Sequence, residues 1–267
     1  MKAFLCAILA GAALQAGCAE AKAPAGYHLV WSDEFDAGTQ PDPAKWRYDT
    51  VRNKDGWWNK EAQYYSANRS ENARIENGRL VIEVRREDLS AMPDFGGQKY
   101  SSARLITDGK AEWTYGFFEI RARLVCNRGG WPAIWLMGQN WPKGGEIDIM
   151  EQLGFDPSTV YGTAHTPDSV AHHTPSGEQQ TISEPCTAFH DYQVEWKPDA
   201  VTFMLDGKPY HTYRKPENAT AETWPFDRPE YMLLNVAMGG DWAGQKGIDD
   251  QALPARMEVD YVRVYQK

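Results

Sequence analysis

Three carboxylates lie close together in the run Glu-Ile-Asp-Ile-Met-Glu, at positions Glu146, Asp148 and Glu151. The run is otherwise apolar and is predicted to be a β-strand, in which Glu146 and Asp148 point to the same face because side chains alternate. Glu151 lies an odd number of positions after Glu146 and would point to the opposite face of a regular strand. One inserted residue, a β-bulge near Ile149 and Met150, returns Glu151 to the shared face.

A row of acids on one face suits a reaction that needs one ionised and one protonated carboxyl group. Retaining glycoside hydrolysis uses a nucleophilic carboxylate and an acid/base carboxyl about 5–5.5 Å apart. The bulge favours Glu146 and Glu151 as this pair, with Asp148 between them as a coupled third group. A calcium site and a solvated acidic edge are the alternatives. The apolar strand, which follows a Trp- and Gly-rich segment, favours catalysis.

Strand signals recur along the chain, and helical periodicity is almost absent beyond the first residues. Two β-like runs are joined at Asn77-Gly78 and two more at Asp206-Gly207, which is typical of hairpins. Further strands are predicted at 117–124, 231–238 and 258–265, the first with one buried face and one face that is wet or lines a groove. Many short strands with Gly and Pro turns predict an all-β, antiparallel β-sandwich or jelly roll.

Eleven tryptophans and thirteen tyrosines can serve either a sandwich core or a sugar-stacking surface. Trp135 fits packing between sheets as well as it fits a cleft. Trp141 and Trp242 flank Gly and Pro, so we expect them to be exposed. Exposed indoles beside carboxylates are typical of a carbohydrate cleft.

The first 21 residues have the features of a secretory signal peptide, with Lys2, a short apolar stretch and a small-x-small site ending at Ala21. Residues 22–267 then form the mature protein. The alternative is a lipoprotein signal that ends before a lipidated Cys18. The apolar stretch is short for a membrane span. Either signal predicts export, to the periplasm or the exterior, or to the outer membrane if Cys18 is lipidated.

The mature length suits one large domain, which we expect to be a monomer. The net charge of −9 argues against nucleic acid or anionic lipid as a partner, and it weighs against a strongly anionic polysaccharide. Export leaves Cys126 and Cys186 in an oxidising compartment, where they form a disulfide or remain as two buried thiols.

The segments Gly130-Trp-Pro-Ala-Ile-Trp-Leu-Met137, Trp141-Pro and Gly145-Glu-Ile-Asp-Ile-Met-Glu151 resemble glycoside hydrolase family 16, in particular its bacterial laminarinase-like endo-β-1,3-glucanases. The likeness covers nearly the whole mature chain. It includes further matches at 31–36, 61–65, 100–104, 234–240 and 260–264.

The resemblance implies a jelly roll with a concave substrate cleft and a retaining double displacement without a catalytic cofactor. Glu146 would be the nucleophile, Asp148 the assistant and Glu151 the acid/base. The bulged spacing is similar to that of the laminarinase, agarase and carrageenase branches of the family.

The resemblance also implies cleft and metal positions. Candidate substrate-binding residues are Asn59, Arg104, Trp131, Trp135, Trp141, His165, Asn235 and Trp242. His165 is expected on the strand after the catalytic one, bonded to the acid/base or the substrate, unless it is structural. A structural calcium ion on the convex face would be held by Glu34, the carbonyl of Gly78 and Asp260. His172 and His173 are expected in a solvated loop.

The sequence therefore predicts a secreted endo-acting hydrolase of β-1,3-glucan such as laminarin. The enzyme alternatives are hydrolysis of mixed-linkage glucan, agarose or carrageenan. Sulfated galactans call for several basic cleft residues, and near the motif only Arg104 and Arg128 are available. The non-catalytic alternative is a glucan-binding module, but such relatives typically lose the acids that this chain keeps.

Overall fold

The computed structural model describes residues 23–267. The predicted signal peptide and the alternative lipidation site Cys18 lie outside these residues, and both stay predictions. In the range 23–267, no helix has the length and apolar character needed to cross a membrane.

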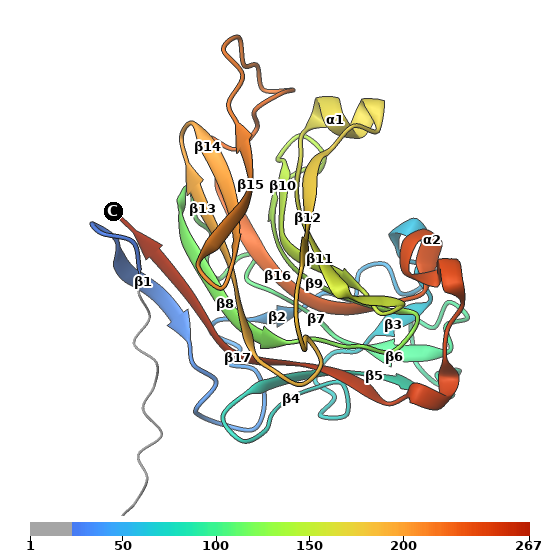
Figure 1. The fold of residues 1–267 in the computed structure, drawn as a ribbon. Coiled ribbons are helices and arrows are strands. Elements are labelled where there is room, and N and C mark those ends of the chain that lie inside the picture. The colour runs from blue at the N-terminus through green and yellow to red at the C-terminus, as the bar shows by residue number, and fades with distance from the viewer. Residues whose placement is uncertain (1–22) are drawn as a thin grey trace, which may run out of the picture.

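Two curved, mainly antiparallel sheets pack face to face in the described part of the chain (Figure 1). The ten-stranded sheet contains, in spatial order, β15 (Lys208–Arg214), β14 (Ala200–Leu205), β13 (His190–Lys197), β8 (Gly116–Arg123), β17 (Ala255–Gln266), β5 (Leu80–Arg86), β6 (Tyr100–Ser102) and β3 (Gln63–Tyr65). Off this path, β1 (His28–Asp33) pairs with β17, and β4 (Ala73–Ile75) pairs with β5.

The seven-stranded sheet carries the acidic strand near its middle. Its spatial order is β12 (Ser176–Thr181), β11 (Asp156–His165), β10 (Glu146–Leu153), β9 (Gly130–Gly138), β16 (Glu230–Met238), β7 (Arg104–Ile106) and β2 (Arg47–Tyr48). Each neighbouring pair in this sheet is antiparallel. The predicted all-β sandwich is confirmed.

Helices are short and lie in the connections. They are α1 (Pro167–His172) and α2 (Gly240–Ala243), with 3₁₀ turns η1 (Trp58–Lys60), η2 (Gly244–Lys246) and η3 (Asp250–Ala252). Thr166 caps α1 by accepting a bond from the Ser169 amide, and Pro167 follows it at the first helical position. The prediction of a loop is therefore wrong for His172, because this residue is the last of the helix. Both His172 and His173 are exposed, as predicted.

Both predicted hairpins are confirmed. Asn77 and Gly78 join β4 to β5 with φ angles of 55° and 71°, and Asp206 and Gly207 join β14 to β15 with φ angles of 50° and 75°. A two-residue turn with two positive φ angles matches the twist of the flanking strands, and Asn, Asp and Gly adopt that conformation at the lowest cost.

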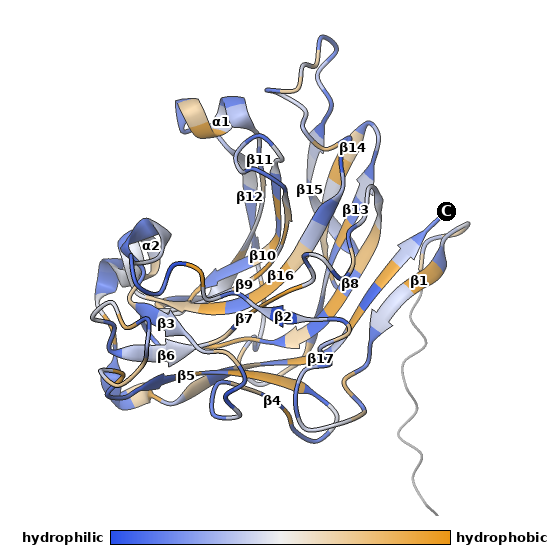
Figure 2. Cartoon of the chain, turned by 180° about the vertical axis from the view of Figure 1, so that it is seen from behind, coloured by the Kyte–Doolittle hydropathy of each residue, from blue (hydrophilic) through white to orange (hydrophobic). Residues whose placement is uncertain are grey.

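The core fills the space between the sheets, and alternation along each strand decides what faces it. On β16, Met232, Leu234 and Val236 enter the core, whereas Tyr231 and Asn235 line a cleft on the other side. Figure 2 shows apolar residues concentrated along the strands and hydrophilic residues in most loops.

The polar face of β8, for which the sequence allows either solvent or a groove, lies on the outside of the ten-stranded sheet. Arg121 there pairs with Asp191 at 3.2 Å, and Arg123 pairs with Glu258 at 2.6 Å. These charges form cross-strand ion pairs and line no part of the cleft.

Cys126 and Cys186 form a disulfide, with their Cα atoms 5.7 Å apart. The bridge joins the connection between β8 and β9 to the connection between β12 and β13. Each of these connections runs from one sheet to the other, so the bridge ties the two crossings together. The alternative of two free thiols is wrong.

Candidate active site

The predicted bulge is present on β10. Across β11, Asp148 pairs with Thr163 and Glu151 with Tyr161, so three steps along β10 match two along its neighbour. The register against β9 shifts within this interval, between Asp148 and Met150. Ile149 and Met150 are both buried in the core, and the bulge thereby keeps Glu151 on the face of the other two acids.

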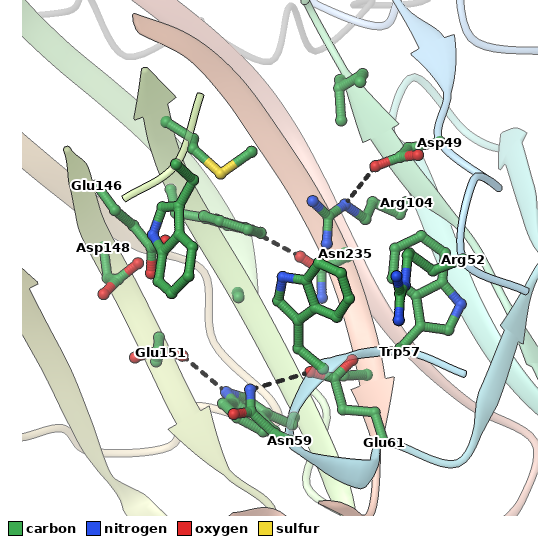
Figure 3. A pocket seen from close by; sticks show the side chains of 18 of the residues that line it. Asp49, Arg52, Trp57, Asn59, Glu61, Arg104, Glu146, Asp148, Glu151 and Asn235 are labelled. Carbon is green, nitrogen blue, oxygen red and sulfur yellow. Dashed lines mark hydrogen bonds and ion pairs between the residues drawn. The ribbon is translucent and has the colours of Figure 1, made fainter. Parts of the chain in front are cut away.

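All eleven predicted catalytic and substrate-binding residues line one cavity of about 600 Å³ on the open face of the seven-stranded sheet. Figure 3 shows part of it, with the three acids of β10 along one side and Arg104, Asn59 and Trp57 opposite. Trp135 and Asn235, which are 100 positions apart in the chain, meet here because β9 and β16 lie side by side.

Burial sets the protonation of the acidic row. It raises the pKa of Glu146 to about 8, with the Asp148 charge adding to the effect and His165 opposing it. Burial also raises the pKa of Asp148. The pKa of Glu151 is raised well above its ordinary value by burial and then by the charges of Asp148 and Glu146. The row therefore retains protons near neutral pH, as acid/base chemistry requires.

The indole of Trp131 holds Glu151 in place. Its Nε1–H donates to Glu151 Oε1 at 2.9 Å, which favours the ionised carboxylate and opposes the effect of burial on the pKa of Glu151. Trp131 is only 8 % exposed, so the donor is fixed.

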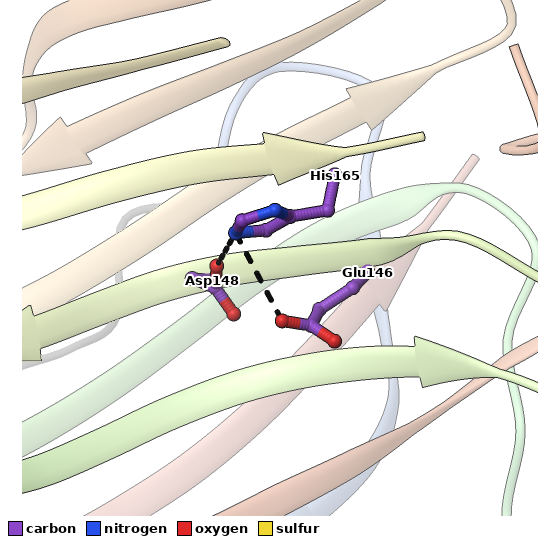
Figure 4. A group of neighbouring side chains, drawn as sticks. All are labelled: Glu146, Asp148 and His165. Atoms are coloured by element: carbon purple, nitrogen blue, oxygen red, sulfur yellow. Dashed lines mark ion pairs between the residues drawn. The ribbon is translucent and has the colours of Figure 1, made fainter. Parts of the chain in front are cut away.

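His165 lies on β11 directly opposite Glu146. Its Nε2 is 3.0 Å from Asp148 Oδ2 and 3.9 Å from Glu146 Oε1 (Figure 4). The structure shows no contact between His165 and Glu151, which was one of its two expected partners. The reason is the register, which places Glu151 opposite Tyr161 instead.

Trp135 belongs to the cleft, so the alternative of packing between the sheets is wrong. It shares the cleft face of β9 with Trp131 because the two lie four residues apart on a regular strand. Its Nε1–H donates to Asn235 Oδ1 at 2.8 Å, and Asn235 Nδ2 donates to the Tyr65 hydroxyl at 3.0 Å. Asn235 is thus buried and orients Trp135.

Arg104 lies between two indoles. Its guanidinium carbon is 4.8 Å from the Trp135 ring centre and 5.1 Å from that of Trp57. Arg104 Nε is 3.1 Å from Asp49 Oδ2. The cation therefore fixes two aromatic walls of the cleft.

The expected exposure is confirmed for Trp141, which is 42 % exposed, and is wrong for Trp242. Trp242 is half-buried, with its ring centre 5.3 Å from that of Trp131 and 5.0 Å from that of Tyr161. The turn of α2 places it there, and the Gly-rich segment hides this packing from sequence reasoning.

Several cleft residues were not predicted, among them Glu61. Its carboxylate accepts bonds from Gln63 Nε2 at 2.8 Å and from Asn59 Nδ2 at 3.4 Å. Burial raises its pKa. An acid isolated in a loop gives no spacing signal, which is why reasoning from carboxylate patterns passed over it. The other unpredicted charged residues in the lining are Arg47, Asp49, Arg52 and Asp241.

Carboxyl groups outnumber arginines in the lining of the cleft. Arg128 does not line it, contrary to the suggestion from the sequence, but Arg47, Arg52 and Arg104 do. Six carboxylates share the lining with these three arginines: Asp49, Glu61, Glu146, Asp148, Glu151 and Asp241.

The calcium site stays a prediction, and its carboxylates have other partners. Both Glu34 oxygens accept bonds from Arg263, at 3.0 and 2.8 Å. Asp260 Oδ1 lies 3.5 Å from Arg79 Nε, and Asp260 Oδ2 lies 3.6 Å from Arg121 Nε. As placed, these side chains do not fit calcium, because ligation would require them to leave guanidinium groups.

The comparisons with known proteins agree with this site. The sequence profile of the glycosyl hydrolases family 16 matches residues 60–263. The chain belongs to glycoside hydrolase family 16. It is therefore a glycoside hydrolase, and the acidic row of β10 lies where such chemistry needs it.

Relatives within the family are similar over nearly the whole chain. A β-glucanase from Rhodothermus marinus is 44 % identical over 99 % of this chain and 93 % of its own length. The solved structure of a non-specific endo-β-1,3(4)-glucanase is 52 % identical, with a TM-score of 0.89, covering 91 % of this chain and 92 % of the other. The laminarinase structure from Rhodothermus marinus has a TM-score of 0.84 at 46 % identity, covering 90 % and 97 %.

Proposed function

We propose that this enzyme is an exported endo-acting hydrolase that cleaves β-1,3-glucan, such as laminarin, with retention of anomeric configuration. The observation that carries the proposal is the bulge of β10, which brings Glu151 onto the cleft face beside Glu146 and Asp148. The aromatic walls around these acids suit a neutral sugar chain.

In the proposed mechanism, Glu146 attacks the anomeric carbon of the sugar while Glu151 gives its proton to the leaving glycosidic oxygen. Burial and the neighbouring carboxylates keep that proton on Glu151 until it is needed. Water then attacks the covalent glycosyl-enzyme, with Glu151 now acting as the base.

Asp148 and His165 serve the nucleophile in this mechanism. In this mechanism Asp148 keeps the proton that the pair retains and Glu146 is ionised, because a charge on Asp148 would raise the pKa of Glu146 further. His165 lies against both carboxylates and limits where they can turn. Asp148 and His165 therefore act as positioning residues.

The choice of glucan rests on charge and on the relatives. Solved laminarinases and β-1,3-glucanases are similar to this chain. A keratan-sulfate endo-1,4-β-galactosidase is also a relative, at 32 % identity. However, two of the three arginines in this cleft already pair with Asp49 and Asp108, which leaves few cations to bind a sulfated chain.

Mixed-linkage β-1,3-1,4-glucan is a second candidate substrate. It is favoured by the likeness to the non-specific endo-β-1,3(4)-glucanase. Linkage preference depends on how the rim of the cleft turns the sugar chain, and the rim here includes exposed Trp58 and Trp141.

A product profile tests the proposal. Purified enzyme is incubated with laminarin, lichenan, agarose and carrageenan, and the early products are sized and their anomeric configuration is followed by NMR. We expect mixed oligosaccharides of β-configuration from laminarin, and no turnover by Glu146→Gln or Glu151→Gln. Turnover of agarose without laminarin would contradict the substrate, and an active Glu146→Gln variant would contradict the mechanism.

A further inference from the structure

Glu146, Asp148 and His165 form a cluster of two acids and one histidine at the wall of the cleft (Figure 4). Each offers one atom, and the three atoms lie within 4.8 Å of one another. In residues 23–267 this is the one group of three or more His, Cys, Asp or Glu side chains so arranged. Two carboxylate oxygens and one imidazole nitrogen thus converge on one point at the cleft wall.

The distances match a metal coordination sphere. Ligands at about 2.0–2.2 Å from a zinc ion, at angles near those of a tetrahedron, lie roughly 3.3–3.6 Å from one another. His165 Nε2 is 3.0 Å from Asp148 Oδ2 and 3.9 Å from Glu146 Oε1, one distance on either side of that range. Small rotations of the His165 and Glu146 side chains bring both distances into it.

Asp148 supplies a second, independent sign of a ligand. The residue is 3 % exposed, and its Oδ2 has no hydrogen-bond partner in the described part of the chain. His165 Nε2 approaches that oxygen without the alignment of a hydrogen bond. A buried oxygen with unused lone pairs is costly, and a cation between it and the imidazole would satisfy both.

We propose that Glu146, Asp148 and His165 bind a divalent transition-metal ion such as Zn²⁺, and that this binding inhibits hydrolysis. Imidazole with carboxylate is a ligand set that suits zinc, whereas calcium and magnesium prefer oxygen alone. The cleft leaves the remaining coordination positions open to water. The inhibitory part rests on the proposed function, because the ion would occupy the carboxylate that attacks the sugar.

Calorimetry measures binding without reference to activity. Zn²⁺ is titrated into the metal-free protein, into His165→Gln, and into the control His172→Ala, which removes an exposed histidine that faces only Asp168. We expect one site in the wild type and in the control, and an affinity at least about tenfold lower in His165→Gln. Equal affinity in His165→Gln would overturn the site.

Kinetics and competition test the inhibition. Zn²⁺ is expected to raise KM for laminarin with kcat unchanged, and a bound laminarin oligosaccharide is expected to block the calorimetric signal. Inhibition of each variant is expressed relative to its own metal-free rate. Zinc that binds through His165 yet leaves KM unchanged would overturn the inhibition. If laminarin is not a substrate, the calorimetric comparison of the variants still decides the metal site.

Discussion

Glu146 and Glu151 are chemically identical side chains on one strand, and their neighbours give them different properties. Glu151 accepts a bond from the Trp131 indole, whereas Glu146 faces His165 and Asp148. Burial raises the pKa of both. At this scale, function depends on which donors and charges surround each carboxyl group.

The Trp131 contact predicts a shift in pH dependence. Trp131→Phe keeps the ring but removes the donor, so the pKa of Glu151 rises further and the acid stays protonated to higher pH. A hydrogen bond to a charged group contributes about 1.5–3 kcal/mol, so the alkaline limb of kcat/KM moves up by roughly one unit or more. The matched control is Trp135→Phe, whose indole bonds to Asn235 instead. An unmoved limb in Trp131→Phe would contradict the assigned role.

Glu230 is a buried acid that the mechanism does not use. It is fully buried at the start of β16, and neither carboxylate oxygen has a hydrogen-bond partner in the described part of the chain. Burial raises its pKa well above the ordinary value, with the charges of Glu146 and Asp148 adding to the effect. A pKa raised by folding gives stability that is full below the unfolded-state pKa and declines as pH rises above it.

Glu230→Gln is therefore expected to flatten the pH dependence of stability. Each unit by which folding raises the pKa of Glu230 corresponds to about 1.4 kcal/mol in the free energy of unfolding. The wild type loses this contribution progressively as the pH rises above 4.5, the ordinary pKa of a glutamate. Melting temperatures are measured from pH 4 to pH 8 for the wild type, Glu230→Gln and the exposed control Glu222→Gln. The prediction fails if Glu230→Gln loses as much stability on going to pH 8 as the control does.

At the scale of elements, the bulge of β10 reconciles two demands. The strand must bury Ile147, Ile149 and Met150 and still present three acids to the cleft. A regular strand of this sequence would send Glu151 into the core. The extra residue interrupts the pairing at the bulge, but β10 still pairs with both β9 and β11 before and after it.

Deleting single residues from β10 tests this account. Removing Met150 makes the spacing regular and leaves all three acids on one face, whereas removing Ile147 places Glu146 and Asp148 on opposite faces. Both deletions remove a fully buried side chain and should cost about 2–5 kcal/mol of stability. We expect residual laminarin hydrolysis only after the Met150 deletion. Comparable activity in the two deletions, measured on protein with native circular dichroism, would refute the bulge argument.

At the scale of the whole molecule, the two sheets share one core and one covalent link. The cleft depends on the seven-stranded sheet keeping its curvature over the other sheet (Figure 1). The bridge between Cys126 and Cys186 closes a segment of 60 residues that includes β9, β10 and β11. Neither cysteine lines the cleft, so its effect should be on stability.

Replacing both cysteines by alanine is expected to lower the free energy of unfolding by about 2–5 kcal/mol. For a chain of this size the melting temperature should fall by roughly 5–15 °C. Activity at 25 °C should be nearly unchanged. The measurement is thermal unfolding with and without reductant, since reduced wild type should match the variant. A large loss of kcat/KM in folded variant would show that the bridge shapes the cleft.

Local signals in the sequence were sufficient for the strands, the two hairpins and the acidic row, because alternation and turn chemistry are properties of neighbouring residues. The spacing of Glu151 even required the bulge. Only the tertiary structure decided that Trp135 faces the cleft and that His165 contacts Asp148 and Glu146. It also decided that Glu61 lines the same cleft. Those facts depend on which strands pair and in what register, and such long-range pairing leaves no mark on either segment alone.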